Sequence, residues 1–72
     1  MKMYERIRQL REDKDLGQKE MAKFLGVHQT TYSDYELGNL NIPVEMLIKL
    51  AKYHKTSIDF LLNLTNNPNP YN

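Results

Sequence analysis

Gln29 and Thr30 are the residues of this chain whose side chains are best suited to recognising another molecule by hydrogen bonding. A glutamine amide can pair with N6 and N7 of adenine, and a threonine offers a hydroxyl and a methyl group to base edges in the DNA major groove. Gln18 supplies a further carboxamide, which at the first turn of a helix can hold a phosphate oxygen together with backbone N–H groups. The sequence contains no nucleophile–base–orienter set, no paired carboxylates and no metal-ligand spacing, so we expect no enzyme activity, no metal and no cofactor.

These side chains need a fixed frame, and the surrounding pattern predicts two short helices joined by a tight turn. Gly17 is an acceptable N-cap for a helix that begins at Gln18. Gly26 supplies the backbone freedom for a sharp turn. A following helix is expected over residues 29–37, closed by Gly38. The pair predicts a helix-turn-helix, which points the amino end of its second helix into the major groove.

Further helices are predicted before and after this pair. A first amphipathic helix is expected over residues 2–13, Pro43 sets the first turn of a fourth, and Ser57 or Thr56 caps a short fifth. Their apolar residues recur at helical spacing: Met3, Ile7 and Leu10 in the first, Val44, Leu47, Leu50 and Ala51 in the fourth, and Ile58, Leu61 and Leu62 in the fifth. The expected fold class is all-α, a compact five-helix domain.

Length and composition limit the other possibilities. The chain has 72 residues, no cysteine and a net charge of +1, which is little charge for a nucleic-acid binder. We assign residues 1–64 to one domain and residues 65–72, rich in Asn and Pro, to a flexible tail. No signal peptide or membrane-length apolar run is evident, so the cytoplasm is the expected location.

Short motifs follow one another in a characteristic order from Arg6 to Leu62. They are Ile7-Arg8-Gln9-Leu10-Arg11, Leu16-Gly17-Gln18, Met21-Ala22, Leu25-Gly26-Val27, Thr31-Tyr32-Ser33, Tyr35-Glu36-Leu37-Gly38, Ile42-Pro43, Leu47-Ile48-Lys49-Leu50-Ala51 and Ser57-Ile58-Asp59-Phe60-Leu61-Leu62. Their order and spacing together resemble the lambda-repressor-like, Cro-type helix-turn-helix family, also called xenobiotic-response-element regulators. The resemblance implies that the helix-turn-helix lies at the second and third helices.

The resemblance also implies base contacts from the third helix. The family commonly touches bases at the positions of Gln29 and Thr30, Ser33 is expected at a phosphate or a base edge, and a further base-reading position falls on Asp34. Asp34 departs from the family, which often has Arg, Lys, Gln or Asn there. The departure matters because the phosphate field repels a carboxylate. Two interpretations stay open: Asp34 accepts a hydrogen bond from cytosine N4, or it points aside and pairs with a nearby Lys or Arg.

Phosphate contacts are expected on both sides of this helix. By resemblance Gln18 holds a backbone phosphate, with Lys19 beside it, and the amides of Asn39 and Asn41 can donate from the following loop. His28 takes a position where the family usually has a Ser or Thr N-cap. It is either an exposed turn residue or a phosphate contact that strengthens when the imidazole is protonated.

Structural roles are expected for several polar and aromatic residues. Arg11 and Glu36 match a family pair that forms a partly buried salt bridge between the first and third helices. Tyr32 and Tyr35 share the face of Val27 and the core, so we expect them to pack inside and not to stack on bases. His54 is expected simply to end the fourth helix.

The resulting hypothesis is a sequence-specific transcriptional regulator, a repressor, that binds a palindromic double-stranded DNA operator. A homodimer is expected because one recognition helix reads only a few base pairs. Apolar residues beyond the core make Ile48, Tyr53, Phe60 and Leu64 the candidate dimer contacts. The alternative is a protein-interaction module or antitoxin that uses the same fold to bind a protein partner. Neither a membrane nor a small-molecule substrate is indicated.

Overall fold

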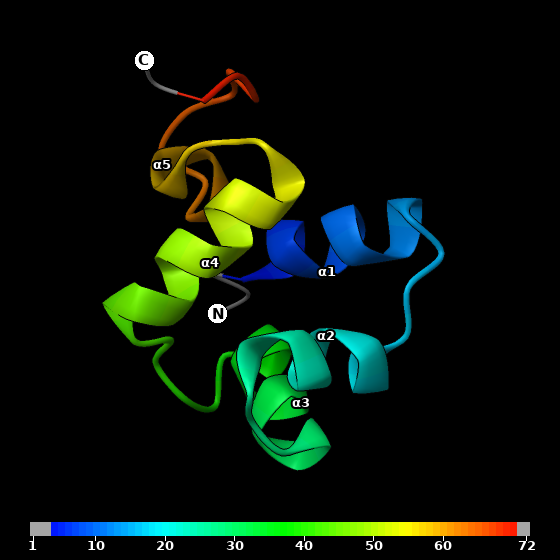
Figure 1. Cartoon of the computed structure of the whole chain (residues 1–72). Coiled ribbons are helices and arrows are strands. Elements are labelled where there is room, and N and C mark those ends of the chain that lie inside the picture. Colours follow the sequence, from blue (N-terminus) through cyan, green and yellow to red (C-terminus); the bar gives the residue numbers. More distant parts are fainter. Residues whose placement is uncertain (1–3, 71–72) are drawn as a thin grey trace.

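The computed structural model describes residues 4–70, and every regular element within them is a helix (Figure 1). The helices are α1 (Glu5–Asp13), α2 (Gln18–Leu25), α3 (Gln29–Leu37), α4 (Val44–His54) and α5 (Ile58–Leu61). The predicted all-α class with five helices is therefore confirmed for the described part of the chain.

The helices form two groups joined by α1. The pair α2 and α3 packs together at one end of the molecule, and α4 packs with α5 at the other (Figure 1). Helix α1 contacts both α3 and α5. The position of α3 relative to the rest of the molecule is thus set by contacts with α2 and α1.

The core draws on every helix. Its fully buried large side chains are Ile7, Met21, Leu25, Tyr32, Leu50 and Leu61. Burying such side chains is the main stabilising contribution in a small domain. No helix can therefore be displaced without exposing core surface. Tyr32 and Tyr35 both lie in this core, with 0% and 6% of their surface exposed.

Two glycines end α2 and α3. Gly26 has φ +75° and Gly38 has φ +79°, both in the left-handed region. Side chains other than glycine rarely adopt this conformation without strain, and it is a common way to end a helix. Both helices start and end where the sequence predicts, with Gly17 as the N-cap of α2.

The fourth helix differs from the prediction at its start. Pro43 is its N-cap and not its first residue, and Val44, expected in the buried stripe, is 65% exposed. The amino end of α4 projects past the other helices (Figure 1), so no helix covers this side chain. Leu47, Leu50 and Ala51 are buried as predicted.

Both ends of the chain lie partly outside the described residues. The described part of the first helix starts at Glu5, and the predicted positions Lys2 and Met3 lie outside the described residues, as do residues 71–72. Residues 65–70 form no helix or strand. The Arg6 guanidinium holds the start of this segment, because it donates to the carbonyl oxygen of Thr65 at 2.8 Å. The flexibility of the tail stays a prediction.

Candidate nucleic-acid interface

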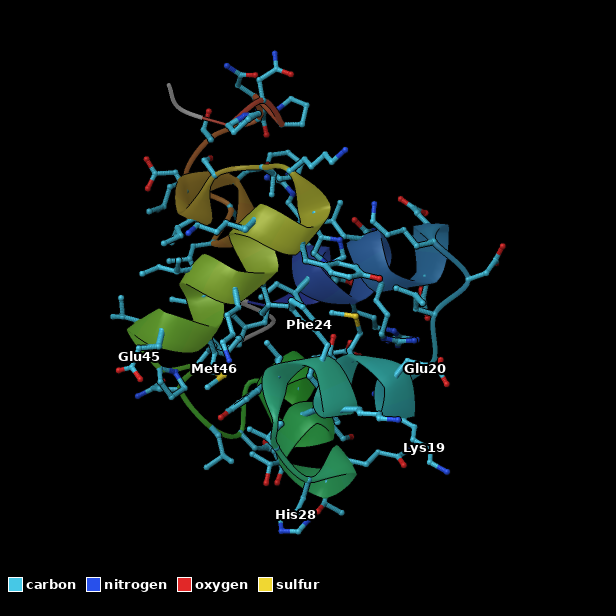
Figure 2. All side chains as sticks on the ribbon, viewed as in Figure 1. Lys19, Glu20, Phe24, His28, Glu45 and Met46 are labelled. Atoms are coloured by element: carbon cyan, nitrogen blue, oxygen red, sulfur yellow. The ribbon has the colours of Figure 1, made fainter. Side chains whose placement is uncertain are left out.

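The amino end of α3 is open to solvent. Gln29 and Thr30 occupy its first positions and are exposed. His28 is the N-cap residue in extended conformation, and its side chain makes no capping hydrogen bond. Figure 2 shows His28 and Lys19 of α2 near the same end of the molecule. The predicted base-reading residues therefore lie beside two predicted phosphate contacts.

Farther along α3, Ser33 and Asp34 are half-buried. The Asp34 carboxylate accepts a hydrogen bond from the side-chain amide of Asn39 at 3.3 Å, and its backbone carbonyl accepts from the Asn39 N–H at 2.9 Å. Within residues 4–70 Asp34 forms no ion pair with Lys or Arg. Its partner is an amide because the loop after α3 carries asparagines and no basic residue. Asn41, also in this loop, is exposed.

A buried polar network fixes α3 to α1 and α2. Arg11 Nε donates to Glu36 Oε2 at 2.7 Å, and Arg11 Nη2 donates to Glu36 Oε1 at 3.1 Å. Gln18 Nε2 donates to Glu36 Oε1 at 3.1 Å. Arg11 also donates to the carbonyl oxygen of Leu16 at 2.7 Å. Three helices thus meet at one carboxylate, and the Gln18 carboxamide is oriented by it.

The opposite charges of Glu36 and Arg11 stabilise each other within this network. Burial by itself would raise the pKa of Glu36, but the hydrogen bonds from Arg11 and Gln18 outweigh it, and the pKa lies below its usual range. The hydrogen bond to Glu36 likewise raises the pKa of Arg11. Burial, with the nearby Glu36 carboxylate, raises the pKa of Tyr32. The pair therefore stays ionised, and breaking it would leave a buried charge unpaired.

His54 is a feature that the sequence interpretation missed. It ends α4 as expected, but it is only 7% exposed, and neither ring nitrogen has a hydrogen-bond partner among the described residues. Its ring meets Tyr53 edge-on, with centroids 5.2 Å apart. Burial, and then the charge of Lys14, lowers the pKa of His54 to about 4. Its spacing from the buried Leu50 was the available signal.

The four candidate dimer residues have different environments. Ile48 and Leu64 are 40% and 72% exposed. Tyr53 packs against Phe24 with ring centroids 4.8 Å apart, and Phe60 lies beneath the Arg6 guanidinium at 4.1 Å. Two of the four therefore already contact side chains of their own chain.

Two other kinds of site are absent from the described part of the chain. Across residues 4–70, no three His, Asp or Glu side chains come together as metal ligands would. None of the described helices has the length and apolar character needed to cross a membrane.

Comparison with known proteins agrees with this geometry. A family model described as helix-turn-helix matches residues 7–61, which is most of the chain. The uncharacterized HTH-type transcriptional regulator YobD of Bacillus subtilis is 33% identical over 66 residues, covering 92% of this chain and 59% of that protein. The cryptic phage CTXphi transcriptional repressor RstR of Vibrio cholerae is 40% identical over 58 residues, covering 81% of this chain and 52% of that protein.

A third relative is the SPbeta prophage-derived uncharacterized HTH-type transcriptional regulator YonR of Bacillus subtilis, 38% identical over 61 residues, covering 85% of this chain and 56% of that protein. The chain thus spans little more than half the length of these curated relatives. No solved structure matches it. All three named relatives are described as transcriptional regulators or repressors. The chain belongs to the helix-turn-helix family of lambda-repressor and Cro-like transcriptional regulators.

Proposed function

We propose that this protein is a repressor that reads a palindromic operator as a dimer, with α3 in the major groove. The observation that carries the proposal is the exposed position of Gln29 and Thr30 on the first turn of a helix whose opposite end is fixed through Glu36. Base readout needs side chains that are accessible and held in a constant orientation. The name of one relative, a phage transcriptional repressor, supports repression as the mode of action.

Phosphate contacts on both sides of α3 would set the position of the helix in the groove. We assign them to Gln18, Lys19 and His28 on one side and to Asn39 and Asn41 on the other. Gln18 gives one amide hydrogen to Glu36, and an amide has a second hydrogen for a phosphate oxygen. Its orientation on the duplex would then depend on the same network that positions α3.

Ser33 and Asp34 complete the proposed base-reading surface. Asp34 Oδ1 accepts from the Asn39 side chain and the Asp34 backbone carbonyl accepts from the Asn39 N–H, so the residue holds the loop at two points. Oδ2 is the oxygen that could still accept from cytosine N4. We therefore propose that Asp34 chiefly positions the loop after α3. A strict requirement for a G·C pair at one operator position would instead assign Asp34 to direct readout.

Selection of bound duplexes from a random DNA library, with purified protein at low salt, tests the proposal. Enrichment of a palindrome whose half-sites are about one helical turn apart is the expected result. Enrichment of a single unrepeated half-site would support base reading by α3 and would contradict binding as a dimer. If the folded protein enriched no sequence, the protein-interaction alternative would replace this function.

A further inference from the structure

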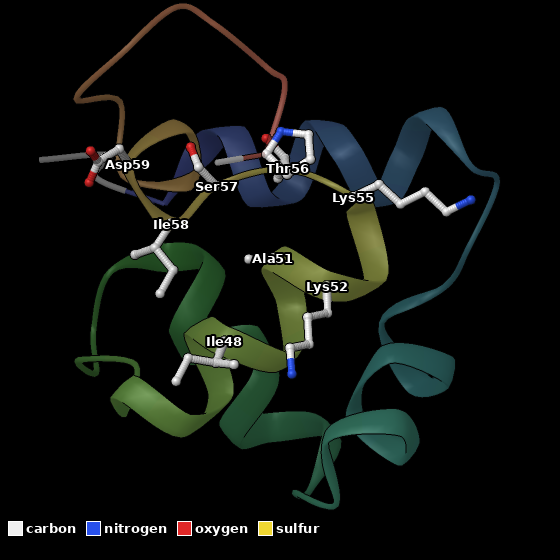
Figure 3. A pocket seen from close by; sticks show the side chains of 9 residues that line it. Ile48, Ala51, Lys52, Lys55, Thr56, Ser57, Ile58 and Asp59 are labelled. Atoms are coloured by element: carbon white, nitrogen blue, oxygen red, sulfur yellow. The ribbon is translucent and has the colours of Figure 1, made fainter. Parts of the chain in front are cut away.

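The residues assigned to base reading and the candidate dimer residues lie in different parts of the fold. Base reading belongs to α3, which packs chiefly on α2. Ile48, Phe60 and Leu64 lie on α4, on α5 and just after α5, with Ile48 in the groove between the two helices (Figure 3). The distance between the two reading helices of a dimer therefore depends on how α4 is held against α2 and α3 within each copy.

A contact between two aromatic rings joins α2 directly to α4. Phe24 near the end of α2 packs against Tyr53 near the end of α4, with ring centroids 4.8 Å apart and planes inclined by 51°. Figure 2 shows Phe24 between these two helices. The Tyr53 ring also meets the buried His54 ring edge-on at 5.2 Å. Two contacts thus fix the orientation of a tyrosine ring that is 36% exposed.

The ring contact holds α4 at the end opposite to its connection with α3. At the start of α4, the loop from α3 is anchored by Ile42, which is 6% exposed. Near the end of α4, Tyr53 rests on Phe24, two residues before the Gly26 turn that leads into α3. Loss of the ring contact would leave the start of α4 anchored and let its far end shift against α2. Because both rings are partly exposed, removing one should leave the core intact.

We propose that the contact between Phe24 and Tyr53 determines which half-site spacing the dimer accepts, by fixing the angle between α4 and the helix-turn-helix. The inference rests on the proposed function, in which two copies read one operator. One base pair added between the half-sites moves one of them by about 3.4 Å and rotates it by about 34°. A rigid link between α4 and α2 resists this displacement, whereas a loose link accommodates it. Phe24 and Tyr53 are therefore positioning residues that touch no base.

A series of duplexes tests the proposal. The selected half-sites are kept, and the spacer between them is one base pair shorter, unchanged or one base pair longer. Fluorescence anisotropy of the labelled duplexes gives the affinity for each. The wild type should prefer one spacing, and Phe24→Ala should reduce that preference about two- to tenfold, the contribution of one aromatic pair. Affinity for a duplex with a single half-site should not change, because α3 keeps its side chains and its support from Glu36.

Further variants separate positioning from a general loss of stability. Tyr53→Ala should have the same effect as Phe24→Ala, and the double variant should add little, because both remove one contact. Tyr53→Phe keeps the ring and should behave as the wild type. Val44→Ala is the matched control, since Val44 is an exposed apolar residue of the same helix. The proposal is overturned if both ring variants, folded by circular dichroism, keep the wild-type preference, or if Val44→Ala reduces it as much.

The same duplexes distinguish this inference from the proposed function. A wild type with a preferred spacing that both ring variants retain would overturn the inference and leave the dimeric repressor standing. A wild type that fills the two half-sites independently at every spacing would contradict the dimer, and this inference with it. Base reading by α3 would survive either result.

Discussion

Glu36 shows how one side chain can support a binding surface without belonging to it. Its carboxylate accepts hydrogen bonds from Arg11 of α1 and Gln18 of α2, and it is 7% exposed. A buried pair of this kind adds little net stability compared with apolar packing, but the loss of one partner is costly. Its main effect is therefore on the geometry of α3 and Gln18.

The substitution Glu36→Gln tests this role. It removes the buried counter-charge of the Arg11 guanidinium and leaves only the half-exposed Glu12 carboxylate at 3.9 Å, so the free energy of unfolding should fall by about 3 kcal/mol. Urea unfolding measures the change. The matched control is Glu45→Gln, because Glu45 is exposed on the first turn of α4, away from Arg11, and should contribute no more than about 1 kcal/mol. Equal unfolding midpoints for wild type and Glu36→Gln would refute the assignment.

His54 makes stability depend on pH. Its pKa in the folded protein is about 4, below the ordinary value of 6.5, so the unfolded chain binds a proton more readily than the folded one. The stabilising effect is complete above pH 6.5 and is lost as the pH falls towards 4. The expected loss is about 3 kcal/mol, from roughly 1.4 kcal/mol per pH unit over that interval.

Urea unfolding between pH 7 and pH 4 checks this prediction. In His54→Leu the decline of stability over this interval should be much shallower than in the wild type. In the control His28→Leu the decline should persist, because His54 is still present. An unchanged decline in His54→Leu would show that other groups cause it.

At the level of elements, the limits of α2 and α3 were the part of the fold that the sequence predicted best. Gly26 and Gly38 each set a left-handed residue at the end of a helix, and this effect of glycine is local. The class of fold followed as well, because helical spacing of apolar residues needs only neighbouring positions.

What the sequence did not predict depends on contacts between distant segments. Val44 fits the apolar stripe of α4 but has no helix above it, whereas His54 is covered although it is polar. The hydrogen bond from Gln18 to Glu36 joins residues 18 positions apart. Such contacts follow from how the helices pack and not from spacing along one helix.

Gly26 offers a test at this level. A Cβ atom there would meet nothing within 4 Å, so the cost of Gly26→Ala is conformational and should be about 1 kcal/mol. Gly26→Asn should cost less, because asparagine tolerates the left-handed region better. Thermal unfolding of the three proteins gives the order. A variant with Ala as stable as the wild type would contradict the left-handed turn.

At the level of the whole molecule, affinity for DNA has to be achieved with a net charge of only +1. Non-specific attraction to phosphates should therefore be weak, and the salt dependence of binding shallow. Specific contacts from α3, doubled by a second copy, would supply the selectivity. The chain spans little more than half of its curated relatives, so these statements concern the domain and its own contacts.

Lys19 tests the phosphate contacts. If it neutralises one phosphate, Lys19→Gln should reduce the slope of log K against log salt by about 0.9 per bound monomer, with base preference unchanged. Fluorescence anisotropy with a labelled duplex at several salt concentrations measures the slope. Lys49→Gln on α4 is the control and should leave the slope unaltered. Equal slopes for Lys19→Gln and wild type would show that Lys19 makes no phosphate contact.

The most direct test of the central claim is the affinity of Gln29→Ala for the selected operator, for each single-base variant of it and for a scrambled duplex. If α3 reads bases through Gln29, affinity for the operator should fall by about 1–3 kcal/mol, preference should be lost at one base pair, and binding to the scrambled duplex should not change. Gln9→Ala, at an exposed glutamine of α1, should behave as the wild type. Full base preference in Gln29→Ala, or equal losses in the two variants, would contradict the account.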